Sequence, residues 1–117
     1  MVKVYCYSKC STCKKALKWL EEKGIAHEVI DIKADNPSEA DLRKYHAMSG
    51  LPLKRLFNTS GMQYRDLELA KKLPAMSDDE QFALLATDGM LVKRPLLVGD
   101  GFVLTGFKEP EWADKLL

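Results

Sequence analysis

The sequence predicts an α/β fold of the α+β kind: a four-stranded mixed sheet with flanking helices and a helical insertion. The first residues follow the order strand, helix, strand, which indicates two parallel strands joined by a right-handed crossover. The last residues follow the pattern of a β-hairpin and a closing helix. A chain of 117 residues suffices for one hydrophobic core. We therefore expect one domain over residues 1–117, with the insertion at about 33–90 between strand 2 and the hairpin.

The first strand is predicted at residues 2–7, where β-branched and aromatic residues dominate. Ser8–Thr12 is a polar loop. Apolar residues then recur at helical spacing from Cys13 until Gly24, a residue type that commonly ends helices. A second strand is expected at His27–Ile32.

The middle of the chain shows helix-start signals and no convincing strand. Ser38 is placed to cap a helix that runs to about Met48. A short helix is expected around Tyr64–Leu69, and Ser77–Glu80 has the sequence of a capping box. This segment is therefore predicted to be a helical block.

The C-terminal segment predicts a hairpin with strands at Leu96–Val98 and Phe102–Leu104, joined by a Gly/Asp turn. Glu109–Leu117 is expected to form the last helix, because Pro110 stands where proline suits a first helical turn.

Composition, net charge and cysteine count exclude several classes of function. The hydrophobic fraction of 46% and charged fraction of 30% are typical of a soluble globular protein. A net charge of +1 offers no field for direct nucleic-acid or membrane binding. Neither a signal-peptide pattern nor an apolar run of roughly 20 residues occurs, so we expect a cytoplasmic protein. Three cysteines there favour catalysis, redox sensing or metal binding over a structural disulfide framework.

The C-x-x-C motif at Cys10 and Cys13 is the main candidate for chemistry. The thiolate is the reactive form of cysteine, and the unpaired N–H groups of a helix start favour it. Cys10 lies at that start, with Lys9, Lys14 and Lys15 close by, so it is the expected nucleophile. Cys13 follows one helical turn later on the same face, where it can resolve a mixed disulfide by forming a Cys10–Cys13 bond.

The residues around the motif allow further roles and other interpretations. Ser11 and Thr12 supply hydroxyls that can bind an oxyanion or the attacked sulfur. Zinc needs four ligands, no second cysteine pair exists, and Cys6, His27 and His46 lack zinc-finger spacing, so no metal is expected. The pair could also be two unrelated buried cysteines, although the strand-helix-strand context argues against this. Cys6, inside a strand, is interpreted as a small core residue.

Arg94-Pro95 precedes the hairpin. A cis proline there would let the loop face the helix start that carries Cys10. A solvated arginine at the start of an edge strand also fits the local sequence.

With these residues in view, the chain resembles the ArsC-like branch of the thioredoxin superfamily, which contains arsenate reductases and Spx-type regulators. It is closer to the C-x-x-C Spx-like members of unassigned role. The resemblance implies a thioredoxin-like fold, a cis Pro95, and an Arg94 that points toward the reactive cysteine. It rests on the following segments: Cys10–Ala16 with Trp19-Leu20, Asp31, Lys93–Val98 and Gly106-Phe107.

The resemblance also shows where this chain departs from arsenate reductases, which gather their oxyanion with three arginines. Arg94 matches one of them, Asn58 stands at the position of another, and Phe107-Lys108 replaces the third. Arg55 and Arg65 are displaced from the expected position. Loss of two bidentate donors should weaken the binding of a tetrahedral oxyanion.

Together these features predict a monomeric thiol–disulfide oxidoreductase in which Cys10 attacks and Cys13 resolves. Ser11, Thr12, Arg94 and Pro95 are the expected substrate-binding residues. No cofactor is expected; glutathione or a thioredoxin- or glutaredoxin-type protein would serve as reductant. The alternatives are a redox-sensing Spx-type regulator that binds the RNA polymerase α subunit, and an arsenate reductase that uses glutathione or glutaredoxin.

Overall fold

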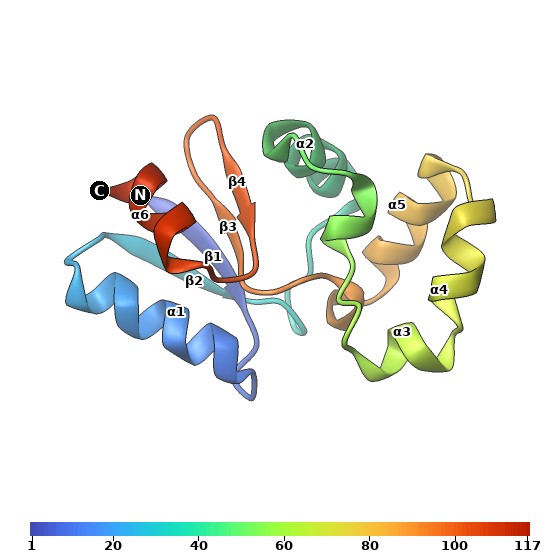
Figure 1. Ribbon diagram of the computed structural model, residues 1–117, viewed down its shortest axis with the longest axis horizontal. Helices are drawn as coiled ribbons and strands as arrows, with labels where there is room; N and C mark the ends of the chain where they lie inside the picture. Colours follow the sequence, from blue (N-terminus) through green and yellow to red (C-terminus); the bar gives the residue numbers. More distant parts are fainter.

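A computed structural model describes residues 1–117 and contains the predicted four-stranded mixed sheet, with strand order β2-β1-β3-β4 (Figure 1). β1 pairs in parallel with β2 and antiparallel with β3, and β3 pairs antiparallel with β4. The predicted fold class is therefore confirmed. The strands are β1 (Val2–Cys6), β2 (His27–Asp31), β3 (Leu96–Val98) and β4 (Val103–Thr105).

The two faces of the sheet carry different layers. Successive side chains of a strand point to opposite faces, so Val4 and Cys6 share one face and Tyr5 lies on the other. The Val4 and Cys6 side packs against α1 (Ser11–Glu22) and α6 (Glu109–Leu116), through Trp19 and Trp112 among others. On the opposite face, Tyr5, Leu96 and Val103 pack into the core of the helical insertion, whereas Lys3 and Glu28 are exposed.

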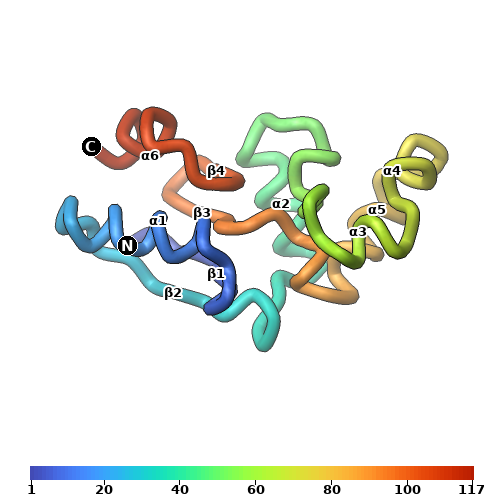
Figure 2. The backbone as a smooth tube through the Cα atoms, turned by 60° about the horizontal axis from the view of Figure 1, so that its bottom comes forward, coloured from blue at the N-terminus to red at the C-terminus, as the bar shows by residue number.

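The insertion lies beside the sheet and gives the molecule an elongated shape of 42 × 28 × 24 Å (Figures 1 and 2). The predicted caps are confirmed: the Ser38 hydroxyl accepts the Asp41 N–H, and Ser77 with Glu80 forms a capping box. No helix of the structure combines the length and apolar character needed to cross a bilayer. The helical segments are α2 (Glu39–Ser49), η1 (Leu53–Leu56), α3 (Met62–Asp66), α4 (Leu69–Lys72), η2 (Leu73–Ala75), α5 (Asp78–Thr87) and η3 (Gly89–Leu91).

Several strand ends differ from the prediction by one residue, and two helix predictions differ more. α1 begins at Ser11 rather than Cys13, because the extended Cys10 already acts as its N-cap. The short helix expected at Tyr64–Leu69 is instead two helices, α3 and α4, separated at Glu68, whose backbone has a φ of 54°. Helical periodicity does not reveal such a break, because the break depends on how the insertion folds back on itself.

Gly89 brings the end of the insertion against the end of strand β2. A Cβ at this position would overlap the backbone carbonyl of Ile32, so only glycine fits without a shift of the chain. This close approach fixes the start of the segment that leads through Arg94 to β3.

Candidate functional site

A tight turn after β1 positions Cys10 at the start of α1. The Cys10 N–H donates to the Tyr7 carbonyl at 3.0 Å, and the Cys10 carbonyl accepts the Lys14 N–H at 3.1 Å. Cys10 is half-buried, whereas Cys13, in the first turn of α1, is only 1% exposed. The two thiols thus differ in access: a substrate can reach Cys10 but not Cys13 directly.

Cys13 lies between two other thiols. It packs beside Cys6, from β1, in one buried cluster against which Cys10 also packs. The hydrogen bond from the Cys6 thiol, with smaller contributions from the Tyr7 backbone, Cys10 and the charge of Arg94, lowers the pKa of Cys13 to about 6 despite its burial. The hydrogen bond with Cys13, together with burial, raises the pKa of Cys6. The buried Cys13 is therefore the thiolate and Cys6 the protonated donor.

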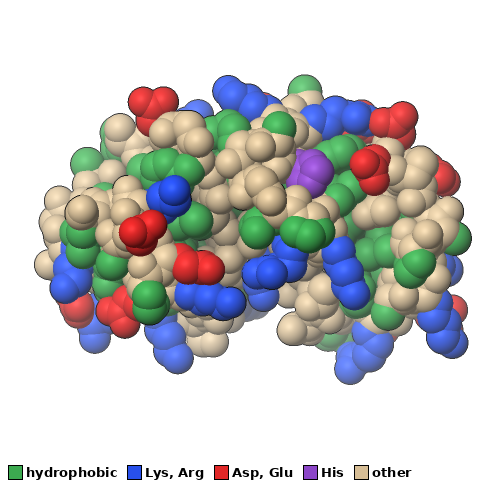
Figure 3. All heavy atoms as spheres, turned by 45° about the horizontal axis from the view of Figure 1, so that its top comes forward, with side chains coloured by type: hydrophobic (Ala, Val, Ile, Leu, Met, Phe, Trp, Pro, Cys, Tyr) green, Lys and Arg blue, Asp and Glu red, His purple; other side chains and the backbone are tan.

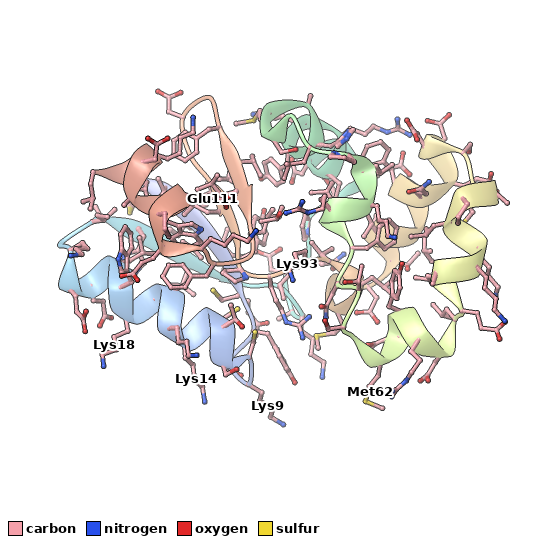
Figure 4. The ribbon with its side chains drawn as sticks, in the orientation of Figure 1. Lys9, Lys14, Lys18, Met62, Lys93 and Glu111 are labelled. Atoms are coloured by element: carbon pink, nitrogen blue, oxygen red, sulfur yellow. The ribbon has the colours of Figure 1, made fainter.

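Cys10 opens onto a cleft of about 600 Å³ between the start of α1, the α3 region and the segment before β3. Figure 3 shows a notch between the sheet half and the insertion, with Lys and Arg side chains on both sides of it. In Figure 4, Lys93 lies between the two halves and Met62 at the outer edge of α3. The cleft is lined by Cys10, Thr12, Asn58, Ser60, Gly61, Met62, Gln63, Asp66, Met90, Lys93 and Arg94.

Arg94 faces the same cleft as Cys10. The peptide bond between Arg94 and Pro95 is cis, as predicted. The guanidinium carbon of Arg94 lies 5.4 Å from the centre of the Tyr7 ring, and Nη1 donates to the Met90 carbonyl at 3.4 Å. The buried Nε has no hydrogen-bond partner. A buried donor without a partner is costly, so this group is suited to an acceptor supplied by a bound substrate.

Only some of the other predicted site residues line the cleft. Thr12 lines the cleft, whereas Ser11, exposed in the first turn of α1, does not. Pro95 is buried, and its carbonyl accepts the Gly106 N–H at 2.9 Å. Lys9 and Lys14 point away from the sheet (Figure 4). The lysines thus lie on the outer surface beside the helix start.

The cleft contains fewer arginines than the three that the resemblance to arsenate reductases implies for an oxyanion site. Asn58 lines it, but Arg55 and Arg65 do not. Phe107 packs instead on Trp112, with ring centres 4.9 Å apart. Arg94 and Lys93 are therefore the cations of the cleft.

Sequence reasoning missed two parts of the site. Gln63 and Asp66, which form part of the cleft wall, come from the insertion and carry no motif. Cys6 was interpreted as a core residue, and it is buried, but it also packs in the same cluster as Cys13 and lines the same hollow. The alternation of side chains in the first strand could have predicted this proximity, because Cys6 lies on the strand face that the following helix covers.

The mixed sheet, the cysteine pair at the start of α1 and the cis proline before β3 define a thioredoxin-like protein. The chain belongs to the ArsC family, whose family model matches residues 5–115. Across 110 residues it is 52% identical to the uncharacterized protein YusI of Bacillus subtilis, covering 94% of this chain and 93% of YusI.

Solved structures agree with this assignment. An ArsC family related protein from Bacteroides fragilis superimposes with a TM-score of 0.94 at 50% identity, covering 97% of this chain and 95% of that one. SACOL0876 from Staphylococcus aureus gives a TM-score of 0.89 at 46% identity, with 97% of each chain covered.

More distant relatives include proteins with named roles. The global transcriptional regulator Spx 2 of Bacillus cereus is 23% identical over 95% of this chain and 83% of its own. An arsenate reductase of Rhizobium meliloti is 27% identical over 83% of this chain and 68% of its own. The family therefore contains both regulators and reductases.

Proposed function

We propose that the protein is a small thiol–disulfide oxidoreductase in which Cys10 attacks and Cys13 resolves. The observation that carries the proposal is the difference between the two thiols: Cys10 opens onto a substrate-sized cleft, and the buried Cys13 behind it has a pKa of about 6. A resolving cysteine must be a thiolate when the mixed disulfide forms, and Cys13 meets that condition at neutral pH.

The reaction is two successive thiol–disulfide exchanges. The Cys10 thiolate attacks one sulfur of a substrate disulfide, and the other sulfur leaves as a thiolate that takes up a proton. The Cys13 thiolate then attacks the Cys10 sulfur, which releases the second substrate thiol and leaves a Cys10–Cys13 disulfide. Two glutathione thiols, or a thioredoxin- or glutaredoxin-type dithiol, restore the reduced protein. A cytoplasmic location, where glutathione is kept reduced, suits this cycle.

Mass spectrometry tests the proposal. The reduced protein is treated with glutathione disulfide, free thiols are alkylated, and the chain is digested with trypsin. Both cysteines lie in one tryptic peptide, Cys10–Lys14. This peptide should lose two hydrogens and escape alkylation. If both thiols of this peptide stay alkylatable after prolonged exposure, the proposal fails.

The pH dependence of resolution should report the Cys13 thiolate. Dithiobis(nitrobenzoate) releases one coloured thiolate when Cys10 attacks and a second when Cys13 resolves. Because the pKa of Cys13 is about 6, the rate constant of the second release should rise with pH up to about 6 and level off above it. An unperturbed cysteine would give a midpoint at about 8.5. Cys13→Ser, which should show only the first release, is the control.

Arg94 should matter most for anionic substrates. Arg94→Gln removes the guanidinium that faces the cleft, so the attack of Cys10 on dithiobis(nitrobenzoate) should slow by about tenfold or more. Attack on neutral hydroxyethyl disulfide should change less. Arg55→Gln, which removes an arginine outside this cleft, is the matched control. Equal slowing of both substrates would contradict a role in binding negative charge.

A second candidate function is transcriptional regulation, which the Spx relatives favour. The resemblance to Spx-type regulators implies binding of the RNA polymerase α subunit through the insertion, at a place where this chain has Leu51–Leu53 after Gly50. A pull-down with the C-terminal domain of the α subunit, in reduced and oxidised states, tests it. Binding in neither state would eliminate this function.

Arsenate reduction is the third candidate, supported by the Rhizobium meliloti relative and by Cys10 beside Arg94. Asn58 in place of a guanidinium leaves the cleft with one arginine. We expect weak arsenate-dependent turnover with glutathione and glutaredoxin, lost in Cys10→Ser. No turnover by the wild-type protein would remove this candidate.

A further inference from the structure

The third cysteine, Cys6, is placed beside the proposed redox pair by the geometry of the strand. It is the last residue of β1, and its side chain faces α1 in the same buried cluster as Cys13. Only 4% of Cys6 is exposed. It is therefore a nucleophilic group in the interior that the two-cysteine cycle leaves unused.

Cys13 lies between the two other thiols. Cys6 and Cys13 belong to one buried cluster and line the same hollow, and Cys10 packs against that cluster, so both neighbours lie close to Cys13. Cys10 and Cys6 line different hollows of the surface. Cys10 lines the large cleft, whereas Cys6 and Cys13 line a separate hollow of about 370 Å³ on the β2 side of α1, beside Val29 and Asp31.

We propose that Cys6 is a third redox-active thiol, which accepts the disulfide from Cys10 by exchange at Cys13. In this step the Cys6 sulfur, having lost its proton, attacks Cys13 Sγ of the Cys10–Cys13 disulfide. A Cys6–Cys13 bond forms, and Cys10 leaves as a thiolate that can take up the proton. The exchange moves no net electrons and needs no further reactant. It rests on the proposed function, which supplies the first disulfide.

The hydrogen bonding explains why the exchange would wait for oxidation. In the reduced protein, the hydrogen bond to Cys13 and burial raise the pKa of Cys6, so Cys6 is protonated and inert. Once Cys13 is part of a disulfide it carries no charge, so the part of this restraint that came from Cys13 is removed, while burial still favours the protonated thiol. The exchange therefore follows the first disulfide.

The product would differ from the ordinary oxidised state in two ways. Its disulfide is buried, away from the cleft at which a protein reductant meets Cys10. Cys10 is free again and can hold a second substrate as a mixed disulfide. This arrangement would let the protein retain an oxidation signal after its first turnover.

Tryptic mapping separates the two disulfides. Cys6 lies in peptide 4–9, and Cys10 and Cys13 lie together in peptide 10–14. A Cys10–Cys13 bond stays within one peptide, whereas a Cys6–Cys13 bond joins two. The wild-type protein is exposed to glutathione disulfide, free thiols are blocked with N-ethylmaleimide at successive times, and the monomer band of a non-reducing gel is digested. We expect joined peptides carrying maleimide on Cys10 to accumulate as the single-peptide form declines.

Cys10→Ser isolates the inner pair and changes only a half-buried residue. Oxidised with diamide in the native state, this variant should join the same two peptides in most chains. Cys6→Ser should form the Cys10–Cys13 bond and no joined peptides. If the wild type forms Cys10–Cys13 while neither it nor Cys10→Ser ever joins the peptides, the relay is overturned and the proposed function stands. If the wild type forms neither bond, both fail.

Discussion

Replacing Cys10 with serine is expected to lower disulfide reduction by roughly three orders of magnitude or more, as loss of a catalytic nucleophile generally does. A serine hydroxyl is not ionised at neutral pH and is a weak nucleophile without an adjacent base. Cys13 cannot substitute for Cys10, because it is 1% exposed and does not line the cleft. The measurement is turnover of hydroxyethyl disulfide by glutathione, coupled to glutathione reductase.

The matched substitution at the other thiol should behave differently. Cys13→Ser keeps the attacking cysteine, so Cys10 should react once and remain as a mixed disulfide with the substrate. Intact-mass measurement should show one adduct per chain, and tryptic mapping should place it on Cys10. If Cys10→Ser kept most of its turnover, or if the adduct lay on Cys13 in the wild type, the two roles would have to be exchanged.

Replacing Trp112 with alanine is expected to lower the free energy of unfolding by about 3–5 kcal/mol. Trp112 is fully buried, and its ring packs edge-on against Trp19 of α1 at 6.2 Å between centres. Its indole N–H also donates to the Gly106 carbonyl at 3.1 Å. The substitution thus leaves a cavity under α1, the helix at whose start Cys10 and Cys13 lie, and removes the donor to a buried carbonyl.

Urea denaturation followed by circular dichroism measures this loss. Trp112→Phe, which keeps an aromatic ring but no N–H, should lose less stability than alanine. Leu117→Ala is the control, because Leu117 is 69% exposed and should change stability little. A loss of under about 1 kcal/mol for Trp112→Ala would mean that α6 is not needed to hold α1 on the sheet.

The sequence by itself determined those features that depend on neighbours along the chain. The two-residue period of the strands, the helical spacing after Cys13 and the Ser77–Glu80 capping box arise within a few residues, so local rules suffice. The cysteine pair belongs to this class, since three residues of helix bring the second thiol round to the first. The cis geometry of Pro95 was obtained from family resemblance rather than from any local rule.

Only the tertiary structure decided what surrounds the pair. The cleft joins Cys10 to Asn58 and Asp66 of the insertion, about fifty residues away along the chain, and no periodicity encodes that meeting. The contact of Cys6 with Cys13 likewise depends on how β1 and α1 pack face to face. That packing stabilises the thiolate at Cys13, where the thiols of Cys6 and Cys10 and the Tyr7 backbone converge. Hydrogen bonding and burial act through space, so the chemistry of each cysteine was settled by the fold.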